Sequence, residues 1–441
     1  MMRRPLRLPL PVLLALLALL AGFAAWAAVA WPRVDFIPAR SAQAWAATPD
    51  NVARGAYLAR AGDCIGCHSA RGGAAYAGGR AIDTPFGRLY GPNLTPDAAT
   101  GIGAWSADDF WHALHNGVGR DGRLLYPAFP YTHYTKVRRD DADALYAYLR
   151  SLPAVRQPNR RHELRFPYDS QLALAGWRLL YFRPGVHGED RARPADWNRG
   201  AYLVEGLGHC SACHSPRNML GGSAEGLSGG LIPTIGWYAP SLTASDEAGL
   251  GASKLPHIVQ LLRTGVAPQG AVSGPMADVV EQSLQHLTEA DLHAMAVYLK
   301  ALPAAPVRHA PAAPPPETVM KQGRQLYQTH CADCHGGDGR GAVTGAGAGA
   351  GAGAAIAYPA LAGNRTLTME EPVNAIRIVL NGGFPPSTAG NPRPYGMPPY
   401  SPVLSDAEVA AVLSYVRASW GNAAPAVMPA EVNRYRAVPL D

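Results

Sequence analysis

The sequence of 441 residues predicts a mainly α-helical protein, in which three tandem helical domains follow an N-terminal membrane anchor. Three observations lead to this prediction. The chain opens with a long uncharged apolar run, one short motif of cysteine and histidine occurs three times, and an amphipathic helical pattern follows each copy. A unit that recurs along a chain indicates a repeated domain rather than one continuous core.

Length and composition agree with a repeated domain. The chain is long enough for about three domains of roughly 100–150 residues each. Its 48 glycines and 40 prolines indicate that loops make up much of every domain. The formal net charge of +6 is not gathered into a long basic run, which argues against nucleic acid as a partner.

The N-terminus has the pattern of a membrane anchor. Arg3, Arg4 and Arg7 precede residues 8–31, a run of 24 residues without charge. As a helix this run would measure about 36 Å, enough to cross a bilayer. Arginines before such a run keep the N-terminus in the cytoplasm and direct the export of the domains behind it. We therefore expect an inner-membrane protein with its domains on the periplasmic side.

A cleaved signal peptide is the alternative to a retained anchor. The small residues Ala42-Gln43-Ala44 could form a cleavage site. The apolar run is longer than the core of about 7–15 residues that signal peptides use. We therefore favour retention of the anchor.

Each repeat begins with a helical stretch that carries a glycine and an aromatic residue, and ends with an amphipathic helix expected near residues 140–152, 288–302 and 405–420. Capping residues and apolar spacing support the three closing helices. We expect the glycine to let two crossing helices approach closely, with an aromatic residue filling the gap beside it. The glycines are Gly55, Gly200 and Gly323, and matching tyrosines of the closing helices are Tyr148, Tyr298 and Tyr415.

These landmarks divide the chain into segments. Polar or proline-rich stretches separate the repeats, and a Gly/Ala-rich stretch at 341–357 is expected to be a disordered insertion without function. The predicted segments are the anchor or signal at 1–33, domain 1 at 48–153, a linker at 154–196, domain 2 at 197–303, a Pro-rich linker at 304–316, domain 3 at 317–420 and a C-terminal tail at 421–441.

All six cysteines occur in Cys-x-x-Cys pairs, each followed directly by histidine. Two thiols three residues apart on a helical turn can form thioethers with the two vinyl groups of one porphyrin, while the adjacent imidazole faces the iron. Cys-x-x-Cys-His is accordingly the attachment motif of c-type haem. The sequence therefore predicts three covalently bound haem c groups. Their attachment residues are Cys64, Cys67, Cys210, Cys213, Cys331 and Cys334, and their proximal iron ligands are His68, His214 and His335.

Two other uses of a Cys-x-x-Cys pair do not fit this chain. A zinc ribbon needs paired motifs about 15–20 residues apart, whereas these motifs lie more than 100 residues apart. A thioredoxin-like redox motif needs a surrounding βαβ pattern, which the sequence lacks. Haem attachment is the interpretation that remains.

A methionine on the loop before the closing helix is the usual sixth ligand, and it raises the reduction potential. Met276 and Met397 each lie 62 residues after the proximal histidine of their domain, beside proline and ahead of the closing helix. We predict that both bind iron. A single methionine could instead fill a core, but two equal intervals favour ligation.

Domain 1 departs from this pattern, because Phe129 stands at the place of the methionine. His133 follows on the same loop and is the candidate sixth ligand. The alternatives are a five-coordinate iron or a surface histidine at this position. His112 and His115 lie on the preceding helix, and we expect them to face solvent or to bind a haem propionate.

Several phrases of the sequence together resemble the tri-haem cytochrome c subunits of bacterial membrane-bound dehydrogenases. The resemblance covers nearly all of the chain after the anchor, and it implies three tandem cytochrome c-like domains. The phrases are Gly91-Pro92-Asn93-Leu94-Thr95, Trp197-Asn198-Arg199-Gly200-Ala201-Tyr202-Leu203, Cys213-His214-Ser215-Pro216-Arg217-Asn218, Gly236-Trp237-Tyr238-Ala239-Pro240, Gly274-Pro275-Met276 and Tyr395-Gly396-Met397-Pro398-Pro399.

This resemblance implies an electron-transfer subunit with no catalytic residues of its own. Members of the family take electrons from a catalytic dehydrogenase subunit and pass them to ubiquinone or a terminal oxidase. The stretch from Tyr126 to His133 is similar to the branch that serves molybdenum hydroxylases of the aldehyde and isoquinoline dehydrogenase type, together with a small iron–sulfur subunit. Two related branches serve quinoprotein alcohol dehydrogenase and flavoprotein gluconate, sorbitol or fructose dehydrogenases.

Two functions from other classes remain as alternatives. A haem peroxidase would need an open iron, which only domain 1 could offer. A haem-based sensor would need a signalling domain, and none follows the N-terminal arginines.

Overall fold

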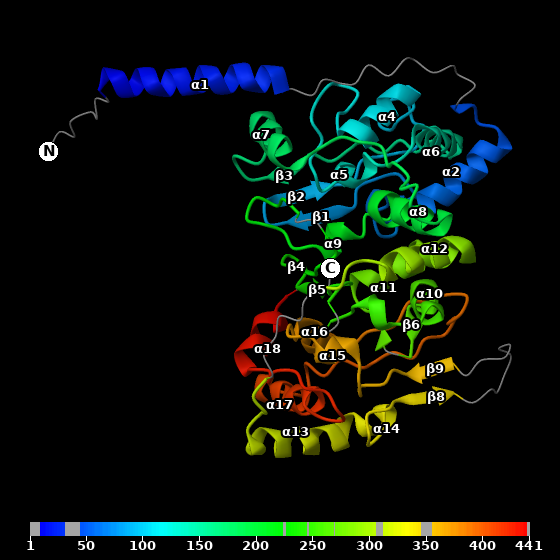
Figure 1. Cartoon of the computed structure of the whole chain (residues 1–441), viewed down its shortest axis with the longest axis vertical. Helices are drawn as coiled ribbons and strands as arrows, with labels where there is room; N and C mark the ends of the chain where they lie inside the picture. Colours follow the sequence, from blue (N-terminus) through cyan, green and yellow to red (C-terminus); the bar gives the residue numbers. More distant parts are fainter. Residues whose placement is uncertain are drawn as a thin grey trace.

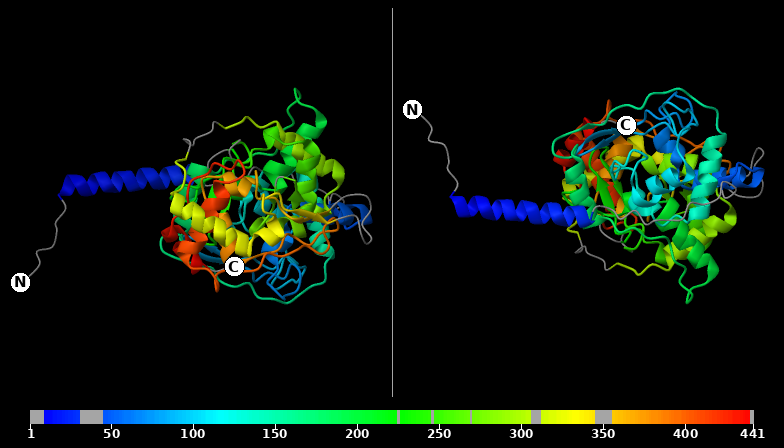
Figure 2. Two further views of the ribbon diagram at one scale, coloured as in Figure 1. Left: turned by 90° about the horizontal axis from the view of Figure 1, so that it is seen from below. Right: turned by 90° about the horizontal axis from the view of Figure 1, so that it is seen from above.

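The computed structural model describes residues 9–30, 45–223, 226–244, 247–268, 270–305, 312–344 and 355–438. Three helical units follow one another along the long axis of the molecule, and a single helix projects from one end (Figure 1). Views from the two ends show the same projection (Figure 2). The predicted cleavage site at 42–44 lies outside the described residues.

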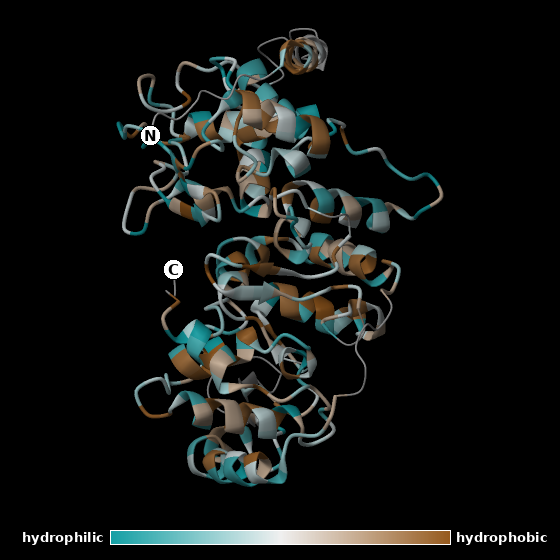
Figure 3. Cartoon of the chain, turned by 90° about the vertical axis from the view of Figure 1, so that its left-hand side faces the viewer, coloured by the Kyte–Doolittle hydropathy of each residue, from teal (hydrophilic) through white to brown (hydrophobic). Residues whose placement is uncertain are grey.

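The projecting helix α1, Leu10–Ala30, coincides with the predicted anchor. Its side chains from Leu10 to Phe23 are exposed, and the helix is hydrophobic where Figure 3 shows it end-on. Over the part of the chain that the structure describes, no helix meets the length and hydropathy needed to cross a membrane. The anchor stays a prediction.

The first unit contains five helices and a small antiparallel sheet, in which β2 lies between β1 and β3. The attachment motif forms the short helix α3. The elements are α2 (Pro49–Ala61), α3 (Cys64–His68), β1 (Ala81–Thr84), β2 (Gly87–Tyr90), α4 (Ala107–Asn116), α5 (Tyr131–Tyr134), α6 (Arg139–Ser151) and β3 (Glu163–Leu164).

The second unit repeats this order with two small hairpins, β4 with β5 and β6 with β7. Its first helix continues into a π-helical turn, η2, just before the attachment motif. The elements are α8 (Ala195–Tyr202), η2 (Leu203–Leu207), α9 (Ser211–His214), β4 (Gly230–Ile232), β5 (Trp237–Ala239), η3 (Leu250–Ala252), α10 (Leu255–Thr264), β6 (Val266–Ala267), β7 (Gly270–Ala271), α11 (Pro275–Gln282), η4 (Leu284–His286) and α12 (Glu289–Lys300).

The third unit is built on the same plan and ends with an additional helix. Its elements are α13 (Glu317–His330), α14 (Ala332–His335), β8 (Ala342–Thr344), β9 (Ala355–Tyr358), α15 (Arg365–Thr368), α16 (Val373–Asn381), α17 (Asp406–Arg417) and α18 (Pro429–Arg436).

In every unit the first helix packs against the closing helix at the predicted glycine: α2 on α6, α8 on α12 and α13 on α17. A Cβ atom added at Gly55 would lie 1.9 Å from the carbonyl oxygen of Ala144 and 2.7 Å from the Cβ of Tyr148. Gly200 and Gly323 meet the equivalent alanine and tyrosine in the same way. The prediction of a close helix crossing is therefore confirmed in all three units.

The core is divided unequally among the units. One cluster of buried apolar side chains runs through the first and second units without a break, from Leu58 to Leu299. The third unit has a separate cluster around Tyr327 and Ile376. The first two units therefore share one apolar core, which does not extend into the third unit.

Three segments contain more structure than the sequence predicted. The linker 154–196 contains helix α7 (Gln171–Tyr181), which packs beside α1. The tail 421–441 contains α18, whose Val432 is buried in the third core. The ends of the Gly/Ala-rich stretch pair as β8 and β9, although residues 345–354 lie outside the described part.

Candidate functional site

The three attachment motifs form one local structure three times. In each motif the four or five residues up to the histidine make a single helical turn. The first cysteine of each pair is half-buried and the second is exposed, and none of the six forms a disulfide. Both thiols of a pair thus remain available on one short turn, as thioether attachment to a porphyrin requires.

The proximal histidines are oriented by proline carbonyl groups. The Nδ1 atom of His68 lies 2.8 Å from the carbonyl oxygen of Pro92. The corresponding distances are 2.7 Å from His214 to Pro240 and 3.1 Å from His335 to Pro359. A carbonyl oxygen can only accept, so Nδ1 carries the proton and Nε2 keeps its lone pair for a metal. Such an outer hydrogen bond is the usual support of a ligating histidine.

Burial keeps these imidazoles neutral. Desolvation lowers the pKa of His68, His214 and His335 below the ordinary value of histidine, although the bond to the proline carbonyl opposes the change. A neutral imidazole is the form that binds a metal. The proline carbonyls were not predicted as part of the site, although the spacing of His and Pro, 24, 26 and 24 residues, offered a signal.

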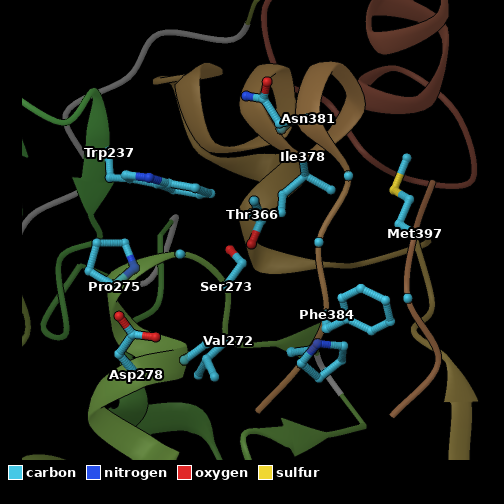
Figure 4. Close-up of a pocket in the computed structure, with 18 of the residues that line it drawn as sticks. Trp237, Val272, Ser273, Pro275, Asp278, Thr366, Ile378, Asn381, Phe384 and Met397 are labelled. Atoms are coloured by element: carbon cyan, nitrogen blue, oxygen red, sulfur yellow. The ribbon is translucent and has the colours of Figure 1, made fainter. Parts of the chain in front are cut away.

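The third site opens into a cavity of about 1240 Å³. Cys331, Cys334 and His335 line it together with Met397. Figure 4 shows Met397 at one side of the cavity and Trp237 of the second unit at the other. The cavity is larger than the roughly 300–1,000 Å³ that hold typical small ligands, so it has room for a porphyrin.

Met276 stands at the start of α11, where it packs against the same buried cluster as Cys210. The loop before it is pressed against Trp237, because a Cβ atom at Gly274 would lie only 2.6 Å from that indole ring. The structure thus brings Met276 to the core of the second unit. Iron ligation by Met276 and by Met397 stays a prediction.

Phe129 occupies the place of the missing methionine in the first unit. It packs against the shared core, with its ring 5.4 Å from the ring of Tyr134. His133 is partly buried and points to the second unit, with Nδ1 3.5 Å from the Oγ atom of Ser211. Burial, followed by the neighbouring His209 and Lys136 side chains, lowers the pKa of His133 to about 4. Ligation by His133 also stays a prediction.

Of the two roles expected for His115, solvent exposure is wrong, and a bond to a haem propionate stays a prediction. His115 is buried, its ring stacks on that of Trp111 at 4.6 Å, and its Nδ1 lies 2.8 Å from the carbonyl oxygen of Thr135. His112 is partly buried and lies 3.1 Å from Asn116. Both histidines therefore support the end of α4 and its contact with the α5 loop.

No group of three or more His, Cys, Asp or Glu side chains within the described ranges could by itself hold a metal ion. A structural zinc site would need four such ligands together. The donor sets fit haem iron instead, because the porphyrin supplies four of the six ligands and the chain needs to supply only the axial ones.

Comparisons with known proteins agree with this geometry. A family model described as cytochrome c matches residues 52–153 and 320–420. The chain is 39% identical to the gluconate 2-dehydrogenase cytochrome c subunit of Pantoea cypripedii, over 86% of this chain and 88% of the relative. It is 37% identical to the cytochrome c subunit of the quinone alcohol dehydrogenase of Komagataeibacter europaeus, over 89% and 86%.

A third relative is a subunit of the nicotinate dehydrogenase of Pseudomonas putida, which is 42% identical over 82% of this chain. The chain spans only 30% of the length of that relative.

Proposed function

Because this chain belongs to the family of cytochrome c subunits of dehydrogenase complexes, in which the members transfer electrons and do not catalyse, we propose a specific place for it in such a complex. It carries three covalently bound haem c groups. It takes electrons from a catalytic dehydrogenase subunit and delivers them to ubiquinone or a terminal oxidase.

The attachment turn, which occurs once in each of the three units, is the observation that supports this proposal. In every unit two thiols, an imidazole with a free Nε2 and a proline carbonyl lie in the same arrangement. Haem c, when bound, supplies an iron that changes its charge by one electron. The chain holds the porphyrin through the thiols, fixes the imidazole through the proline carbonyl, and keeps water away with the buried side chains around each motif.

The partner that we propose is a molybdenum hydroxylase-type aldehyde dehydrogenase with a small iron–sulfur subunit. Phe129 in place of methionine, followed by His133, supports this branch through its resemblance. A quinoprotein alcohol dehydrogenase or a flavoprotein gluconate, sorbitol or fructose dehydrogenase is the second candidate. The similarity to the alcohol and gluconate dehydrogenase subunits favours it.

We further propose that the chain sits on the periplasmic face of the inner membrane. The N-terminal arginines and the apolar helix α1 support this location. Washing membranes with high salt and then with carbonate should leave the chain in the membrane fraction. Release into the soluble fraction, with a mature N-terminus near Trp45, would mean that the run is a cleaved signal.

Reduction by a partner tests the function. The purified chain is mixed with a molybdenum hydroxylase and an aldehyde, and haem reduction is followed by its visible spectrum. We expect reduction only when both are present. Reduction by a quinoprotein alcohol dehydrogenase with ethanol, and not by the hydroxylase, would select the second candidate. Peroxide-dependent turnover by the chain alone would contradict electron transfer as its role.

A further inference from the structure

We propose that the first and second units form a reciprocal pair in which their two haem groups are electronically coupled. The third haem is not part of this coupled pair. The inference rests on the proposed function, since it concerns how that function is divided among the units. Three features of the interfaces support this inference: a reciprocal set of hydrogen bonds, the close approach of the segments that lead into two attachment turns, and a different docking surface for the third unit.

The reciprocal set joins the closing helix of each of the first two units to the first helix of the other. Asp141 pairs with Arg54 of its own unit at 2.6 Å, and its other oxygen accepts the hydroxyl of Tyr202 from the second unit at 2.5 Å. The second unit returns the same pair of contacts. Asp291 pairs with Arg199 at 2.7 Å and accepts the hydroxyl of Tyr57 from the first unit at 2.5 Å.

These contacts relate matching positions in the two repeats. Arg54 and Tyr57 stand around Gly55 as Arg199 and Tyr202 stand around Gly200. When residue i of one unit meets residue j of the other, and j meets i in return, the two units are related by an approximate twofold axis. The unbroken apolar cluster through both units agrees with such a pairing.

The third unit cannot make this contact. At the places of the arginine and tyrosine it carries Gln322 and Gln325, as the register around Gly323 shows. Its acidic residue at the place of the aspartate is Glu408, which caps its own helix through Ser405. The sequence of the third repeat thus excludes it from the reciprocal arrangement.

The segments that lead into the attachment turns of the first two units lie close together at this interface. The hydroxyl of Tyr134 donates to the carbonyl oxygen of Gly62 at 3.2 Å, and the Tyr134 ring lies 5.6 Å from the ring of His209. Gly62 lies two residues before Cys64, and His209 lies directly before Cys210. A Cβ atom at Gly62 would lie 3.4 Å from the Leu207 side chain, so the segments that lead into the two turns pass close to each other.

Thioethers would hold each porphyrin at its own turn, so the close approach of the two leading segments would place the two haem groups near each other. One electron can then pass from a ferrous to a ferric member without any bond or proton changing place.

The third unit docks elsewhere. Asn374 on α16 accepts from the Tyr238 backbone N–H at 2.9 Å and donates to the Tyr238 carbonyl at 2.7 Å. This contact lies on β5, whereas the first two units meet through their first and closing helices (Figure 1). Cys67 of the first unit also lines the cavity of the third site, so coupling between the first and third haems is the alternative arrangement.

Circular dichroism in the Soret band distinguishes these arrangements. Two strongly absorbing groups held close together split this band into a couplet of opposite signs. We expect a couplet in the fully oxidised chain. The double variant Cys210→Ala/Cys213→Ala should lose it, and Cys331→Ala/Cys334→Ala should retain it. The opposite result would assign the couple to the first and third haems and overturn the proposal.

If a variant fails to fold, a redox titration of the unaltered chain still tests whether a coupled pair exists. Reducing either member of the couple moves its band away from that of the other, so the couplet should vanish with the first electron that enters the pair. Tyr57→Phe/Tyr202→Phe should weaken the couplet, while Tyr146→Phe, whose hydroxyl bonds within the first unit to Trp105, should not. An unsplit band in a chain that carries three haems and accepts electrons from its dehydrogenase would refute the pair and leave the function intact.

Discussion

Met276 and Met397 are the residues whose replacement tests the axial ligands most directly. Thioether ligation favours ferrous iron and raises the reduction potential. Replacing either methionine by alanine should therefore lower the midpoint potential of one haem and leave the other two nearly unchanged. Potentiometric titration followed in the visible band measures this effect.

Met219 provides the matched control, because its side chain is 94% exposed. Met219→Ala should move no midpoint. If Met276→Ala also leaves every midpoint in place, the assignment of Met276 as a ligand is wrong.

His133 decides the ligand set of the first haem. An imidazole stabilises ferric iron more than a thioether does, so a haem with two histidine ligands should have the lowest potential of the three. His133→Met should raise that lowest midpoint and no other. A His133→Ala variant with an unchanged spectrum and unchanged midpoints would show that the contact with Ser211 is structural only.

At the scale of single residues, the sequence predicted what the motif contains and missed what supports it. Cysteine and histidine next to each other identify the attachment residues because bonds along the chain fix their spacing. The carbonyl of Pro92 reaches His68 only through the fold of the intervening loop. The burial of His115 was missed for the same reason, since Thr135 lies on another loop.

At the scale of helices, each crossing requires a residue without a side chain, and a substitution of the glycine tests this requirement. In Gly200→Ala the new Cβ would lie 2.0 Å from the carbonyl oxygen of Ala294, so the two helices would have to separate. Overpacking of this kind costs about 1–3 kcal/mol. We expect a lower thermal unfolding midpoint, with partial loss of haem in the second unit during maturation.

Gly176 is the control for this substitution. It lies inside α7, and nothing stands within 4 Å of a Cβ atom added there. Gly176→Ala should stabilise the chain by about 0.5–1 kcal/mol, because alanine loses less conformational freedom in a helix. Equal destabilisation by both substitutions would mean that the close crossing at Gly200 is not what limits stability.

The closing helices were predictable because capping residues and apolar spacing lie within each segment. Helices α7 and α18 were not predicted, because each is short and buries its apolar side chains against other segments. Val432 is covered by the third core, and Trp177 is held by a bond to the Leu220 carbonyl. Neither contact can be read from the local pattern.

At the scale of the whole molecule, the sequence indicated three units but not how they meet. Tyr57 and Asp291 lie 234 residues apart, and no local signal joins them. Tyr202 and Asp141, which stand at the matching positions of the other repeat, form the equivalent contact. The pairing can therefore be recognised once the fold is known. The third repeat lacks these residues, and its unit has a core of its own.

The central claim is that one chain carries three covalent haems for electron transfer. The mass of the mature chain, measured after denaturation and acid extraction, tests this claim most directly, because thioether bonds survive both treatments. The account predicts a mass that exceeds that of the polypeptide by three haem groups. A mature, fully processed chain that retains two haems or fewer would contradict it.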